Sequence, residues 1–94
     1  MKRALIMKQG DSVGVCINEV KAGETVQTTV GDIIANEDIS APHKISVKDI
    51  DYDEPVYKYQ HVIGYATQPI KKGDLVHVHN ISPVQAGDKL GVGK

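Results

Sequence analysis

Two histidines separated by one residue offer the clearest metal-binding arrangement in the chain. His77 and His79 lie in the alternating run Val76-His77-Val78-His79, and alternation of this kind predicts a β-strand. On a strand both imidazoles would point to the same face, about 7 Å apart at a rise of about 3.3 Å per residue. Two imidazoles at this separation can share a divalent metal when further ligands converge on them. The alternative is a pair of exposed polar side chains, with Val76 and Val78 facing the core.

A second candidate is the pair His43-Lys44, which follows Pro42. The neighbouring ammonium group disfavours the protonated imidazole, and a loop can present both side chains to a cleft, so the pair could serve acid–base catalysis. Asn80 comes directly after the histidines of the predicted strand and could orient a ligand or hydrogen-bond a substrate hydroxyl. The alternative for His43 and Lys44 is a loop whose side chains are only solvated.

Lys58 and Tyr59 close a β-favouring segment and form a third candidate. The ammonium group of Lys58 could bind a carboxylate, and the Tyr59 hydroxyl could donate a hydrogen bond. The alternative is that Tyr57 and Tyr59 only pack against the domain and leave their hydroxyls in water.

The aliphatic composition indicates the elements that must position these side chains. The chain has twelve Val and ten Ile against three Leu, and stiff β-branched residues favour strands over helices. Nine Gly and four Pro separate the apolar runs, as turn residues do in proteins built from short strands. We therefore expect a mostly-β domain of short strands and tight corners.

A short pattern recurs along the chain: an apolar residue, two residues, a turn-forming residue, two residues and a second apolar residue. The copies are Val20…Gly23…Val26, Ile39…Pro42…Ile45, Ile50…Asp53…Val56, Ile70…Gly73…Val76 and Val84…Gly87…Leu90. Their spacing is irregular, which excludes a solenoid. The pattern predicts a chain that doubles back repeatedly through corners between buried anchors.

Size and charge exclude several classes of function. The 94 residues, with a formal net charge of −1, form one small domain with no electrostatic case for nucleic acid or an anionic membrane. The single Cys16 cannot form an internal disulfide, and it lies in an apolar run that predicts a buried thiol. The apolar stretch near the amino end is too short for a signal peptide. We expect a cytoplasmic protein whose active site, if it is an enzyme, is completed by a larger partner.

The order of these fragments resembles the SAF domain of the altronate and galactarate dehydratase family, and the small subunit of the related sulfolactate sulfo-lyase. The resemblance spans residues 11–81, and its most specific parts are the His-Lys corner, the Lys-Tyr strand end and the terminal Val-His-x-His-Asn. The family usually reads Gly-His-Lys and Lys-Tyr-Gly at the first two places. Here Pro42 replaces the first Gly, and Gln60 and His61 replace the second Gly and its neighbour.

The resemblance implies a β-clip fold over residues 1–82, followed by a last strand or a tail over 83–94. It also implies a divalent metal, Fe²⁺ or Mn²⁺, held largely by a bigger catalytic chain encoded nearby. The implied reaction removes the proton α to a carboxylate and expels a β-substituent. In that reaction His77 and His79 would bind metal, His43 and Lys44 would be catalytic, and Lys58 and Asn80 would bind substrate.

Three functions are compatible with these residues. The leading hypothesis is the small subunit of a lyase that dehydrates a sugar acid, altronate first. The second is the small subunit of a sulfolactate sulfo-lyase, in which sulfite leaves instead of hydroxide. The third is a β-clip module that binds a sugar acid or aids assembly without chemistry. The sequence leaves self-association of the chain open.

Overall fold

The structure, a computed structural model, describes residues 2–83 and contains nine short strands in that range, with no helix there. The strands are β1 (Lys2–Leu5), β2 (Val13–Cys16), β3 (Thr25–Thr28), β4 (Gly31–Ile34), β5 (Lys44–Ser46), β6 (Pro55–Lys58), β7 (His61–Ala66), β8 (Leu75–Val76) and β9 (Ile81–Pro83). The predicted mostly-β domain is confirmed. The fifth copy of the corner pattern and the predicted tail lie, apart from Pro83, outside the described residues.

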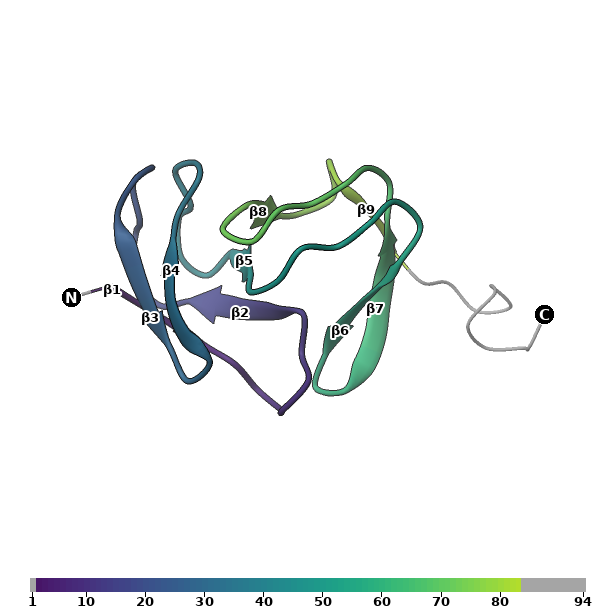
Figure 1. The fold of residues 1–94 in the computed structure, drawn as a ribbon, viewed down its shortest axis with the longest axis horizontal. Helices are drawn as coiled ribbons and strands as arrows, with labels where there is room; N and C mark the ends of the chain where they lie inside the picture. Colours follow the sequence, from purple (N-terminus) through teal and green to yellow (C-terminus); the bar gives the residue numbers. More distant parts are fainter. Residues whose placement is uncertain (1, 84–94) are drawn as a thin grey trace.

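The strands form two sheets. The six-stranded sheet has the order β4-β3-β1-β2-β5-β8, and the three-stranded sheet has the order β6-β7-β9. All neighbouring strands are antiparallel except the parallel pair β1 and β3. The hairpins β3–β4 and β6–β7 stand at opposite ends of the molecule, and β2, β5 and β8 lie between them (Figure 1).

The repeated corner pattern organises the fold into two similar halves. Val20 and Ile39 exchange two backbone hydrogen bonds of 2.8 Å each, and Ile50 and Ile70 exchange two of 2.7 and 2.8 Å. The first corner therefore pairs with the second and encloses hairpin β3–β4. The third pairs with the fourth and encloses hairpin β6–β7. The spacing differs by one residue because β7 contains a bulge, in which Ile63 has no partner on β6.

Each half buries its own cluster of anchors. The first cluster contains Ala4, Cys16, Val20, Val26, Ile33, Ala35, Ile39 and Ile45, and the second contains Val13, Ile50, Val56, Ala66, Ile70 and Val76. Strand β2 connects the clusters, because Val13 lies in one and Cys16 in the other. Burial raises the pKa of the Cys16 thiol, which agrees with the predicted core residue rather than a reactive nucleophile.

The fourth corner requires glycine for two reasons. Gly73 has a φ of +97°, where an L side chain is strained. Its backbone also packs directly against β4: a Cβ atom there would collide with the carbonyl oxygen of Ile34. Asn36 completes the contact by donating its backbone N–H to the Gly73 carbonyl at 2.9 Å. This corner therefore joins the second half of the chain to the first.

Among residues 2–83 the structure contains no helix long and apolar enough to cross a membrane.

Gly73→Ala should lower the free energy of unfolding by at least about 2 kcal/mol, because backbone strain and a collision with β4 act together. Gly23→Ala is the matched control. Gly23 holds the turn position of the first corner with a φ of +89°, but nothing lies within 4 Å of an added Cβ. Its cost should be the strain alone, about 1–2 kcal/mol. Urea unfolding of both variants measures the difference, and equal losses would contradict the packing role of Gly73.

Candidate functional site

The structure brings His43 and His77 together. Lys44 pairs with Val76 across β5 and β8. His43 directly precedes Lys44 and His77 directly follows Val76, so the antiparallel register sets the two histidines opposite each other at the end of this ladder. Their ring centroids are 4.9 Å apart, and the rings are nearly perpendicular at 87°. Sequence reasoning selected both residues for separate roles, and the antiparallel register makes them one site.

His43 is held in an orientation that leaves one ring nitrogen free of the corner. Its Nδ1 lies 2.9 Å from the Ser40 carbonyl oxygen and 3.3 Å from the Ser40 hydroxyl. A carbonyl oxygen can only accept, so the neutral ring carries its hydrogen on Nδ1 and its lone pair on Nε2. Nε2 is then a proton acceptor on a half-buried ring. The arrangement is suited to a general base.

The predicted strand through His77 and His79 is wrong beyond Val76. Strand β8 ends at Val76, and the residues that follow form a turn. Val78 was expected to face the core, but its side chain is 71% exposed. The two imidazoles therefore do not share a strand face. Both side chains are exposed. The metal-binding role of His79 was inferred from a shared strand face, and without that face it stays a prediction.

Asn80 is the reason for this turn. Its Oδ1 accepts the backbone N–H of His77 at 2.9 Å, and its Nδ2 donates to the Leu75 carbonyl at 2.7 Å. Asparagine competes effectively with strand pairing because its side chain can bond to nearby backbone. The residue is 2% exposed, so the predicted substrate contact stays a prediction. Its visible role is to position His77.

Lys44 is the next residue after His43 and begins β5, whereas Lys58 ends β6 in the other sheet. Strand β2 shows the separation: Cys16 donates its N–H to the carbonyl of His43, whereas Ser12 donates to the carbonyl of Tyr57. Ser12 directly precedes β2 and Cys16 is its last residue, so these two contacts are four residues apart along extended chain, which corresponds to about 13 Å. Lys58 lies at the second place, with its Nζ 5.4 Å from the centroid of the Tyr59 ring, a cation–π distance.

Sequence reasoning missed Asp11, which fixes the Lys58–His61 hairpin tip. Its carboxylate accepts three backbone N–H groups: from Lys8 and Tyr59 at 3.0 Å each, and from Gln60 at 2.9 Å. Burial works to raise the pKa of Asp11, but the donated hydrogen bonds outweigh it and hold the pKa below its ordinary value. The acidic residue is 48 residues from Tyr59, and no local pattern relates them.

The tip itself has an unusual backbone for its residues. Tyr59 and Gln60 form a two-residue loop with φ values of +59° and +64°. Type I′ hairpin turns require positive φ at both places and usually contain Asn or Gly. The hydrogen bonds to Asp11 are what compensate for the strain here, and the result is a fixed presentation of Lys58 and Tyr59.

Comparison with known proteins identifies the architecture. The family described as the altronate/galactarate dehydratase SAF domain matches residues 2–84. The chain belongs to this family. The SAF domain is 31% identical over 80 residues to an altronate dehydratase of Bacillus subtilis, a match that covers 85% of the chain and 16% of that protein. It is 33% identical over 70 residues to an altronate dehydratase of Escherichia coli, covering 74% of the chain and 14% of that protein.

A third relative is much closer in length. The SAF domain is 37% identical over 78 residues to the (2R)-sulfolactate sulfo-lyase subunit alpha of Chromohalobacter salexigens, covering 76% of the chain and 83% of that subunit. Relative to the two dehydratases, by contrast, it spans about a sixth of the length or less. The named relatives are therefore lyases that contain this domain either as a small part or as most of a subunit.

The described residues do not make a complete metal site. Within residues 2–83, no group of three or more His, Cys, Asp or Glu side chains is placed to hold an ion. Proteins bind transition metals tightly with three or four such ligands. His43 and His77 alone fall short of this number, and an ion at this place would need ligands from outside the described residues.

Replacing Asp11 with Asn should destabilise the SAF domain by about 1–3 kcal/mol at pH 7, since an amide nitrogen cannot accept the backbone N–H groups. The folded pKa of Asp11 is depressed, so its stabilisation is complete above the unfolded value near 3.8 and disappears as the pH falls through the folded value. The gap between wild type and Asp11→Asn should therefore narrow below pH 4. Urea unfolding at several pH values measures it, and a gap that is constant with pH would contradict this role.

Gln60→Gly should raise the free energy of unfolding by about 0.5–1 kcal/mol, because glycine adopts positive φ without strain. Gln60→Ala is the control, since it removes the weak 3.4 Å contact of the Gln60 amide with the Gln9 carbonyl and keeps the strain. Thermal unfolding compares the two. A Gly variant no more stable than the Ala variant would show that the turn is not strained.

Proposed function

We propose that this SAF domain is the small subunit of a lyase that removes water from a sugar acid, with altronate as the first substrate to test. Its family membership and the names of two relatives support the reaction class. The small share of those dehydratases that the domain spans supports a larger chain that supplies the rest of the active site. The domain would contribute the His43–His77 pair to that site.

The free Nε2 of His43 is the observation that carries the proposal. In the elimination, a base takes the proton α to the carboxylate, the C–H electron pair forms a double bond, and hydroxide leaves the β-carbon. Among the described residues, His43 Nε2 would accept that proton, because Nδ1 is bonded to the Ser40 carbonyl oxygen. The neighbouring ammonium of Lys44 would bind the substrate carboxylate and stabilise the negative charge that develops on it.

His77 would assist by its contact with the base. An edge-to-face ring at 4.9 Å limits the rotation of His43, and a base with a fixed orientation transfers protons more effectively than a mobile one. The hydrogen bonds of Asn80 set the position of His77 in turn. A divalent cation, Fe²⁺ or Mn²⁺, belongs to the proposal as an ion held mainly by the larger chain.

Sulfolactate is the second candidate substrate. The sulfo-lyase subunit alpha is the relative whose length the domain matches, at 83% coverage and 37% identity. The same proton removal would then expel sulfite rather than hydroxide. Only the leaving group would differ from that of the dehydratase. His43 and Lys44 would have the same roles in both reactions.

The test is to purify this chain with the larger protein encoded beside it and to assay both acids with Fe²⁺ or Mn²⁺. Formation of a 2-keto-3-deoxy acid from altronate would support the dehydratase, and release of sulfite would support the sulfo-lyase. His43→Ala should lower kcat at least about a hundredfold, as expected for a general base.

Tyr52→Ala is the control for this experiment, because it removes a 68% exposed ring from a different corner and should leave turnover unchanged. If the assembled complex containing His43→Ala turns over as fast as wild type, the catalytic role of His43 is contradicted. Assembly without activity on either acid would favour the third hypothesis, a β-clip module without chemistry.

A further inference from the structure

The outer face of strands β1, β3 and β4 carries an ordered row of polar side chains. Inward residues of these strands belong to the first core cluster, so the alternating positions point away from it. Arg3 pairs with Gln27 across β1 and β3, and Gln27 pairs with Asp32 across β3 and β4. A cation, an amide and an anion therefore lie side by side on adjacent strands, spaced about 4.8 Å apart.

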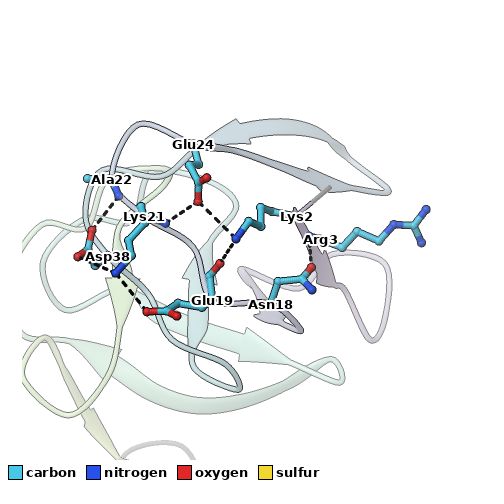
Figure 2. Close-up of polar contacts among 8 residues, drawn as sticks. All are labelled: Lys2, Arg3, Asn18, Glu19, Lys21, Ala22, Glu24 and Asp38. Carbon is cyan, nitrogen blue, oxygen red and sulfur yellow. Dashed lines mark hydrogen bonds and ion pairs between the residues drawn. The ribbon is translucent and has the colours of Figure 1, made fainter.

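The two charged side chains of this row, Arg3 and Asp32, are free to pair with another molecule. Figure 2 shows the Arg3 side chain extending away from the cluster formed by Lys2, Glu24 and their neighbours, with no dashed contact from its guanidinium group. Within the part of the chain that the structure describes, the side chains of Arg3 and Asp32 take part in no ion pair, whereas Lys2 pairs with Glu24 at 3.7 Å. Asp32 is exposed.

The surface around the row is hollowed and partly apolar. A depression of about 300 Å³ is lined by Arg3, Ala4, Leu5, Gln27, Thr28, Thr29 and Asp32. Leu5 is 47% exposed on β1, and Val30 is 62% exposed at the tip of hairpin β3–β4. Protein–protein interfaces combine an apolar centre with a polar rim and are enriched in arginine.

We propose that this face binds a second copy of the chain about a two-fold axis that runs along β3 over Gln27. The row reverses sign across this axis, so a two-fold rotation places Arg3 of each copy opposite Asp32 of the other. Leu5 follows Arg3 by two residues on β1, and Val30 lies at the tip of hairpin β3–β4, two residues before Asp32. The same rotation brings Leu5 of each copy toward the hairpin tip that carries Val30 of the other. A surface that complements itself in charge and in apolar groups fits its own copy.

The position of this face agrees with the lyase proposal without depending on it. In the sheet order β4-β3-β1-β2-β5-β8, the outer face lies on the three strands at one edge, and β8 beside His77 is the opposite edge. Self-association would leave the histidine pair free for a larger chain.

Charge exchange tests the proposal on the full chain alone. Sedimentation velocity from micromolar to near-millimolar concentration should show a dimer that dissociates with added salt, because the Arg–Asp pairs are screened. Arg3→Asp and Asp32→Arg should each weaken the dimer at least about tenfold, since each variant sets like charges opposite one another. The double variant Arg3→Asp/Asp32→Arg should restore dimerisation, because it restores opposite charges.

Lys48→Asp is the matched control, with the same change of charge as Arg3→Asp on an exposed residue outside the row. It should not alter the dimer. Circular dichroism confirms the fold of each variant. If a charge variant fails to fold, Gln27→Glu replaces it, because it sets two carboxylates against each other on the axis and should also weaken the dimer.

A chain that stays monomeric at every concentration would overturn the proposal, as would a double variant no better than the single ones. Loss of binding to the larger protein in Arg3→Asp, with no dimer in the wild type, would assign this face to that protein instead. None of these outcomes uses lyase activity, so they do not bear on the proposed reaction.

Discussion

Two reciprocal pairs of backbone hydrogen bonds determine the architecture of the domain: Val20 with Ile39, and Ile50 with Ile70. Each pair bonds one corner to the next corner along the chain. The chain therefore comes back beside the earlier corner after forming one hairpin. The bonding residues are buried, where a satisfied backbone pair is strong and an unsatisfied one is costly. Closure also places the segments after the second and fourth corners beside each other, as β5 and β8. The histidine pair exists only because those strands meet.

The sequence predicted the corners better than their partners. β-branched composition and the recurrence of apolar anchors around Gly, Pro or Asp predicted short strands and tight turns, and the anchors of the four described copies are buried. The recurrence alone did not show that the first corner bonds to the second and the third to the fourth. The copies begin at residues 20, 39, 50 and 70, so the two halves repeat at 30 and 31 residues while successive copies are unevenly spaced. The one-residue difference is the bulge at Ile63.

The sequence predicted only part of the site, because side chains there bond to backbone groups that strand pairing would otherwise use. Alternation after Val76 predicted a strand, and Asn80 ended it by bonding to the backbone of His77 and Leu75. A period-two pattern carries no information about such a bond. Asp11 was missed for a different reason: two of its three backbone partners lie at the tip of a distant hairpin, and contacts between residues so far apart in sequence leave no local pattern.

The histidine pair lies at a place where the two halves of the fold differ in structure. Ser46 and His77 occupy corresponding positions at the ends of β5 and β8. Ser46 continues the ladder, because its carbonyl accepts the N–H of Gly73 at 2.9 Å. The residue that corresponds to Gly73 is Pro42, which has no N–H to offer to the carbonyl of His77. That carbonyl accepts from the turn that follows, so the ladder opens between His43 and His77. The rings of His43 and His77 contact each other at this end. Proline in place of glycine in a repeated corner therefore distinguishes the end of the ladder that carries the histidines from the end at Ser46.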